Sequence, residues 1–137
     1  MAHNGINGEK RVAEHRKENM SNLSLPRLDY AGLLEGGYSS TPKRVAYETA
    51  ISRDGDRFTL FHHGTPIAMI GPRSVAITNA GWQSRTTCHR LNAVTTANGV
   101  GWVYIHEGRM LFTSDRKIVH GGRAARRTGV PVPTRKW

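Results

Sequence analysis

The chain of 137 residues has a single cysteine, few aromatic residues and no long apolar run. The lone Cys88 excludes an internal disulfide and any cysteine-rich zinc module, so we take a reducing cytoplasm as the default. No stretch approaches the roughly 18–20 apolar residues of a membrane span, and we expect no secretory signal because the N-terminal region lacks an apolar core. Only 37% of the residues are hydrophobic and 7% aromatic, so we do not expect the whole chain to form one well-filled core.

Acidic residues are scarce relative to basic ones. Ten Asp and Glu stand against twenty Lys and Arg, which gives a net charge of +10. Residues 1–43 hold six basic and five acidic residues, residues 44–114 seven and four, and residues 115–137 seven and one. The last segment is also rich in Gly and Pro, and both this composition and like-charge repulsion oppose regular structure. We therefore predict a flexible basic tail over 115–137.

The segment 1–43 is predicted to be largely extended or disordered, because most of it is too polar to build a core. Its exception is a leucine-rich stretch, Leu23–Leu34. One interpretation of this stretch is a docking segment for a host or virion protein. We favour the alternative that it covers one side of the following domain, since apolar residues usually serve the core of their own chain.

Residues 44–114 are predicted to fold as an α+β domain, because their apolar residues recur at the spacing of strands. Four strand patterns come first, at 47–52, 58–63, 67–70 and 75–79. Asp54-Gly55 between the first two suits a tight hairpin turn, and Ser84 can cap a helix that runs to about Ala97. Two more strands follow, at 102–105 and 110–112. The order β-β-β-β-α-β-β with short loops indicates a small antiparallel sheet with one helix packed on it, and a strongly curved, half-barrel sheet is equally compatible.

The residues that carry chemistry are not arranged for catalysis or metal binding. Cys88 falls on the apolar face of the predicted helix, and the adjacent His89 projects about 100° away, so the two do not form a nucleophile–base pair. His62 and His63 point to opposite sides of a strand and do not share a metal site. Neither a phosphate-binding glycine loop nor a carboxylate pair stands in a credible position. We expect a protein that is not an enzyme and that uses no metal and no cofactor.

Clustered arginine favours nucleic-acid binding, because guanidinium groups engage phosphates bidentately and stack on bases. Trp82 and Trp137 offer further stacking surfaces, whereas the alternation around Trp102 predicts a core position. No helix-turn-helix, zinc-finger or RNP motif is present, so we expect binding to DNA or RNA through backbone charge with little sequence selectivity. The predicted contact residues are Arg85, His89, Arg90, Arg109, Arg116, Lys117, Arg123, Arg126, Arg127, Arg135 and Lys136. The alternative is a protein-interaction module that uses Leu23–Leu34 or an exposed sheet edge.

Two short motifs carry a resemblance to known proteins. They are the strand motif Thr65–Ala68, of sequence TPIA, and the helix start Ser84–Thr87, of sequence SRTT, with His89 close behind it. Over roughly residues 46–113 the chain resembles a small domain family of phage and prophage proteins. The resemblance implies a viral origin and action in the cytoplasm of a bacterial host, and it supplies no activity.

Overall fold

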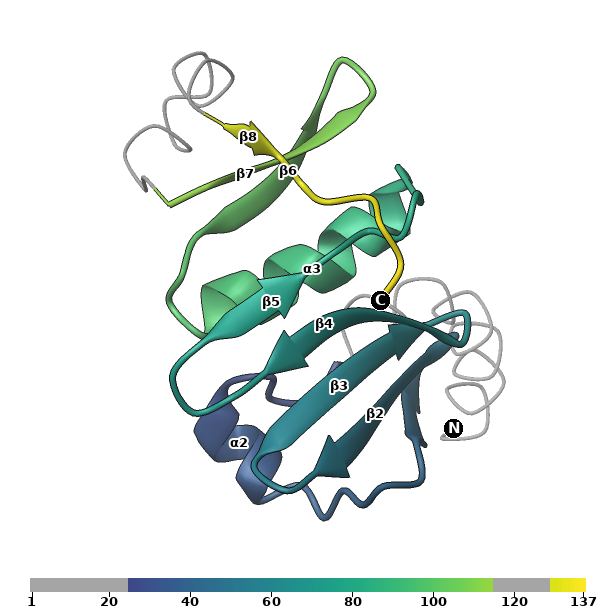
Figure 1. Cartoon of the computed structure of the whole chain (residues 1–137), viewed down its shortest axis with the longest axis vertical. Coiled ribbons are helices and arrows are strands. Elements are labelled where there is room, and N and C mark those ends of the chain that lie inside the picture. Colours follow the sequence, from purple (N-terminus) through teal and green to yellow (C-terminus); the bar gives the residue numbers. More distant parts are fainter. Residues whose placement is uncertain (1–24, 115–128) are drawn as a thin grey trace, which may run out of the picture.

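The structure is a computed structural model, and it describes residues 25–114 and 129–137. Five strands form one antiparallel sheet in chain order (Figure 1): β1 (Lys43–Ala46), β2 (Thr49–Asp54), β3 (Arg57–His62), β4 (Thr65–Ile70) and β5 (Val75–Ile77). The alternation of apolar residues that predicts these strands also decides their orientation, because Ile51, Phe58 and Leu60 are buried on the core face. The predicted antiparallel α+β fold is confirmed, and the sheet is open.

The helix α3 (Arg85–Ala97) follows this sheet and begins where the sequence predicts. Ser84 caps it, since its hydroxyl accepts a hydrogen bond from the Thr87 N–H at 3.2 Å. Leu91 and Val94 are fully buried in the same core as the sheet residues. In Figure 1 the helix runs between the five-stranded sheet and a second, smaller sheet, which the sequence does not predict as a separate unit.

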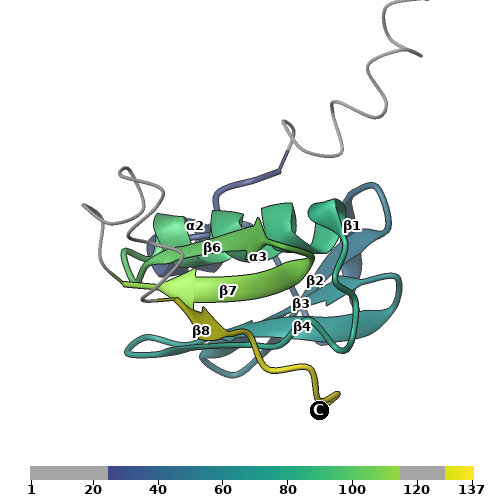
Figure 2. The same ribbon diagram turned by 90° about the horizontal axis from the view of Figure 1, so that it is seen from above.

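The second sheet contains β6 (Trp102–His106), β7 (Arg109–Thr113) and β8 (Val130–Pro131), paired antiparallel in that order. Figure 2 shows β8 beside β7, and the C-terminal residues continue from β8 toward β4. Val132 is buried in the common core, and its N–H donates to the Met110 carbonyl at 3.0 Å. The predicted flexible tail is therefore wrong for residues 129–137, because an apolar residue and backbone hydrogen bonds hold them against the domain.

The described part of the leucine-rich stretch, residues 25–34, also belongs to the folded domain. Within it lies a short helix, α2 (Tyr30–Leu34), capped by the Asp29 side chain. Leu28 and Leu33 are buried in the core, which confirms the interpretation that the stretch covers its own domain. The prediction of an extended or disordered segment is wrong for residues 25–43, whereas residues 1–24 lie outside the described residues.

Candidate functional site

Two hairpin turns and one loop bring aromatic side chains together at one end of the five-stranded sheet. We call Tyr47, His62, His63 and Trp82 the aromatic cluster. Tyr47 lies in the β1–β2 turn, His62 ends β3, His63 lies in the β3–β4 turn, and Trp82 lies between β5 and α3. The His63 and Trp82 rings stack with centroids 4.9 Å apart and planes 13° from parallel. Tyr47 meets His63 edge-on at 6.4 Å.

Much of this cluster faces solvent. Tyr47 is 56% exposed and Trp82 is 39% exposed, and His63 is exposed as well. The carboxylate of Glu48, in the same turn as Tyr47, lies 3.7 Å from His63 Nδ1. Large aromatic residues gain most of their stabilising effect from burial, so Tyr47 and Trp82, both left partly exposed against His63, suggest a role outside the core.

The backbone at the cluster is unusual. Glu48, His63 and Ala80 adopt positive φ angles of 48°, 52° and 55°, although none of them is glycine. Such angles are uncommon for residues with a Cβ atom and gather at functional sites. His63 and Gly64 form a two-residue turn in which both φ angles are positive, which matches the twist of the β3–β4 hairpin. This turn presents the His63 ring to Trp82.

Arg90 supports the cluster from beneath. Its side chain is fully buried, its Nε donates to Thr49 Oγ1 at 2.9 Å, and its Nη2 lies 3.5 Å from the carbonyl oxygen of Tyr47. Burial lowers the pKa of the guanidinium from its ordinary value. The sequence-based expectation that Arg90 is a surface contact is therefore corrected: its guanidinium is used inside the domain, where it fixes the β1–β2 turn.

His62 is the buried member of the cluster. Its ring lies 4.3 Å from that of His63 and 6.1 Å from that of Trp82, and its Nδ1 has no hydrogen-bond partner among the described residues. Burial lowers its pKa to about 4, with smaller contributions from His63 and Arg90. The His62 ring is therefore neutral near pH 7.

The loop that carries Trp82 is anchored to the C-terminal residues. The Thr78 hydroxyl lies 2.9 Å from the Pro133 carbonyl oxygen and 2.7 Å from that of Arg135. The next turn, Asn79–Trp82, is closed by a hydrogen bond of 2.8 Å from the Trp82 N–H to the Asn79 carbonyl. Arg135 and its neighbour Lys136 are thus held beside the turn that ends at Trp82.

Two more predicted contact residues lie at the same loop. Arg85 is exposed and starts α3, three residues after Trp82. Arg109 is exposed at the start of β7, and the N–H of the next residue donates to Gln83 Oε1 at 2.9 Å. We call Arg85, His89, Arg109, Arg135 and Lys136 the basic rim. His89 belongs to it because it is exposed one helical turn after Arg85.

The remaining predicted contacts lie in the connection between β7 and β8. Arg116, Lys117, Arg123, Arg126 and Arg127 are outside the described residues. The strands on either side are paired, with Phe112 opposite Val130 and Leu111 opposite Pro131. The described strands on both sides of residues 115–128 therefore belong to the domain.

Comparison with known proteins places the chain in a phage family. Residues 32–124 match the family model of the Kyanoviridae Gp96 protein, which covers more than half of the chain. The chain belongs to the Kyanoviridae Gp96 family. This confirms the resemblance to a phage domain family that the strand and helix motifs carry. No curated protein and no solved structure matches the chain.

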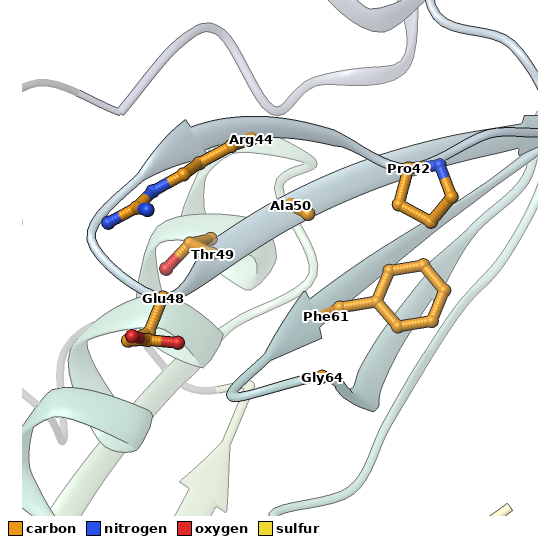
Figure 3. A pocket seen from close by; sticks show the side chains of 7 residues that line it. All are labelled: Pro42, Arg44, Glu48, Thr49, Ala50, Phe61 and Gly64. Carbon is orange, nitrogen blue, oxygen red and sulfur yellow. The ribbon is translucent and has the colours of Figure 1, made fainter.

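This Gp96 family member also has a hollow on the outer face of its larger sheet (Figure 3). Its volume is about 270 Å³, and its lining residues are Pro42, Arg44, Glu48, Thr49, Ala50, Phe61 and Gly64. Arg44 and Glu48 bring opposite charges to one end, and the Phe61 ring stands at the other. Because Glu48 also faces His63, the hollow and the aromatic cluster adjoin.

Other chemistry finds little support in the part of the chain that the structure describes. There, no group of three or more His, Cys, Asp and Glu side chains is placed to hold a metal ion. Cys88 is buried, and burial raises the pKa of its thiol. Among the described helices, none has both the length and the apolar character to cross a bilayer.

Only part of the aromatic cluster is predicted from the sequence. Trp82 is predicted as a stacking surface from its type alone, whereas the meeting of Tyr47 with His63 is not predicted. The hairpin supplies the missing signal: Thr49 pairs with His62, so the residues just before β2 and just after β3 lie side by side.

Proposed function

We propose that the protein is a non-enzymatic phage accessory protein that binds nucleic acid through backbone charge with little sequence selectivity. The observation that carries this proposal is the basic rim. Arg85, Arg109 and Arg135 are distant in sequence, yet all three lie around the loop from Thr78 to Ser84. Grouped cations of this kind raise the local concentration of a polyanion.

The chemistry of the rim suits phosphate. Guanidinium groups stay charged at any pH that the protein meets and form paired hydrogen bonds with phosphate oxygens. Glu48 and Glu107 are the acidic residues closest in the chain to the aromatic cluster and to Arg109, respectively. They reduce the net charge of this end of the molecule but leave the basic residues in excess. The five further basic residues between β7 and β8 add to the attraction.

Low selectivity follows from the way α3 is packed. Cys88, Leu91 and Val94 of the helix are buried in the core, so the exposed side with Arg85 and His89 is the one that can approach a ligand. Contacts to phosphate position a protein on its ligand without distinguishing bases. We therefore expect similar affinities for unrelated sequences of equal length.

The test is the salt dependence of binding, measured by fluorescence anisotropy with a short labelled duplex. On duplex DNA each lost phosphate contact reduces the log–log salt slope by about 0.9. Arg85→Ala and Arg135→Ala are expected to weaken binding and to reduce this slope. Arg73→Ala is the matched control, because Arg73 is exposed in the β4–β5 turn. This turn follows the last residue of β4, whereas His63 precedes the first, so the two lie at different ends of the strand. Equal slopes for all variants contradict the proposal.

The second candidate is a protein-interaction module that acts on a host or virion protein. Leu28 and Leu33 are buried in the core and are not accessible to a partner, so the leucine-rich stretch gives this candidate little support. Its support is an apolar hollow of about 170 Å³ between β5 and β8, lined by Val75, Ile77, Thr95, Val100, Phe112, Val130, Pro131 and Pro133. A partner that is retained after nuclease and high salt, and lost in Val130→Asp, supports this candidate.

A further inference from the structure

We propose that the aromatic cluster stacks the unpaired bases of single-stranded nucleic acid, so that the protein prefers single strands to duplex. This inference rests on the proposed function and names its substrate class. It concerns the faces of Tyr47, His63 and Trp82, whereas the proposed function concerns the charges of the basic rim. The two are therefore open to separate tests.

The first argument is the geometry of the exposed rings. The His63 and Trp82 rings are already parallel at 4.9 Å, and a base placed on such a pair continues the stack. Tyr47 stands edge-on to His63 and is more than half exposed, so it offers a second ring at the border of the stack. A duplex keeps its base faces inside its own stack, which leaves single strands as the ligand that uses these rings.

The second argument is preorganisation. The β1–β2 turn is tied to α3 by the Arg90–Thr49 hydrogen bond, and the Trp82 turn is closed by its bond to Asn79. The Gly81 N–H also donates to the Asn79 side chain at 2.7 Å. Rings that are held in place before binding lose less conformational entropy when a base arrives, which increases affinity.

The third argument is the charge around the rings. Arg85 starts α3 three residues after Trp82, and Arg135 is anchored at the beginning of the same loop. Arg44 lines the hollow on the other side of the β1–β2 turn, next to Glu48. Cations thus lie on the same elements that carry the rings, near the β1–β2 turn and near the loop of Trp82. Proteins that bind single strands combine basic residues with stacked aromatic side chains in this way.

The experiment compares labelled oligothymidylate with a duplex of equal length, by anisotropy at low and moderate salt. Trp82→Ala is expected to weaken single-strand binding by about tenfold or more, the effect typical of one stacked base. Duplex affinity is expected to change little. Trp82→Phe keeps a ring and is expected to retain most of the single-strand affinity. Arg73→Ala is the control for a distant surface change.

A second variant guards against loss of the fold. Tyr47→Ala removes an exposed ring but keeps the backbone carbonyl that faces Arg90, so it is expected to stay folded and to weaken single-strand binding selectively. Thermal unfolding of each variant checks this. If Trp82→Ala unfolds, the Tyr47→Ala result decides.

Three results overturn the inference, and they are distinguishable. In the first, wild-type protein binds both probes, and Trp82→Ala and Tyr47→Ala bind the single strand as tightly as wild type does. This result excludes the stacking role and leaves the charge-driven function in place. Equal losses on single strand and duplex also remove the stacking role, because they assign the rings a structural role. Wild-type protein that binds neither probe ends the proposed function and this inference with it.

Discussion

Arg90 of α3 donates a hydrogen bond to the Thr49 hydroxyl at 2.9 Å, and both residues are buried. The contact joins the middle of the helix to the first residue of β2. The Thr49 hydroxyl in turn donates to the Tyr47 carbonyl at 2.7 Å. A buried cation thus holds the backbone of the turn that carries the exposed Tyr47 ring, which links the packing of the core to the aromatic cluster.

Thr49→Val is expected to lower the free energy of unfolding by about 1–3 kcal/mol, because it removes the buried oxygen that accepts the hydrogen bond from Arg90 Nε. Urea unfolding followed by circular dichroism measures this. Thr59→Val is the control, since Thr59 is half-buried in the neighbouring strand β3 and alternates with the core residues Phe58 and Leu60, which places it on the other face of the sheet. A similar loss in both variants would indicate a general effect of removing a strand hydroxyl.

Stability is expected to fall between pH 6.5 and pH 4 because of His62. Its pKa is about 4 in the folded protein against an ordinary value of 6.5, so in this interval the unfolded chain binds a proton that the folded chain rejects. The stabilising contribution is complete above pH 6.5, declines as the pH falls, and amounts to at most about 3 kcal/mol. Urea unfolding at several pH values is expected to show a smaller loss in His62→Phe than in wild type. Parallel pH profiles would refute this role.

Leu33→Ala is expected to destabilise the protein by about 2–5 kcal/mol, since its side chain is fully buried and its removal leaves a cavity. Leu34→Ala is the matched control, because the neighbouring side chain is 42% exposed, and we expect a change within about 0.5 kcal/mol. Thermal and urea unfolding provide the comparison. Equal effects would mean that α2 does not dock as the structure has it.

The central fold is readable from the sequence because its signals are local. Asp54-Gly55 marks the β2–β3 hairpin, Ser84 marks the start of α3, and the alternation around Phe58 marks the buried side of a strand. Each of these depends on residues a few positions apart, so composition and spacing are sufficient. The open sheet and its neighbour sheet depend on long-range pairing, which such patterns do not report.

The sequence analysis fails for buried residues whose own charge, or whose polar neighbours, suggest an exposed position. Arg90 lies at helical spacing from Thr87 and Val94, both buried, so its position on the core face is readable once the charge is set aside. Val132 stands among prolines and basic residues, and nothing local reveals that it fills a place in the core beside Met110. The candidate site combines both cases, because its support Arg90 is buried and some of its cations come from the C-terminal residues beside Val132.

Val132→Ala is expected to lower the free energy of unfolding by about 2 kcal/mol, because its buried side chain joins β8 to the core. Val130 lies two residues earlier, on β8, and is 55% exposed, so Val130→Ala provides the matched control and is expected to change stability little. Chemical denaturation of the two variants beside wild type tests the pair. Indistinguishable midpoints would restore the prediction that the C-terminal residues form a free tail.

Thr78→Val is expected to weaken nucleic-acid binding although Thr78 is fully buried. Its hydroxyl lies 2.7 Å from the Arg135 carbonyl oxygen, so the substitution releases the C-terminal cations from the loop of Trp82. Arg135→Ala is then expected to cost less affinity in the Thr78→Val background than in wild type, because residues that act through one contact are not additive. Anisotropy titrations of the four proteins complete the cycle, and thermal unfolding confirms that each is folded. Strictly additive losses would show that Arg135 acts independently of its anchor, and that the basic rim owes its effect to total charge alone.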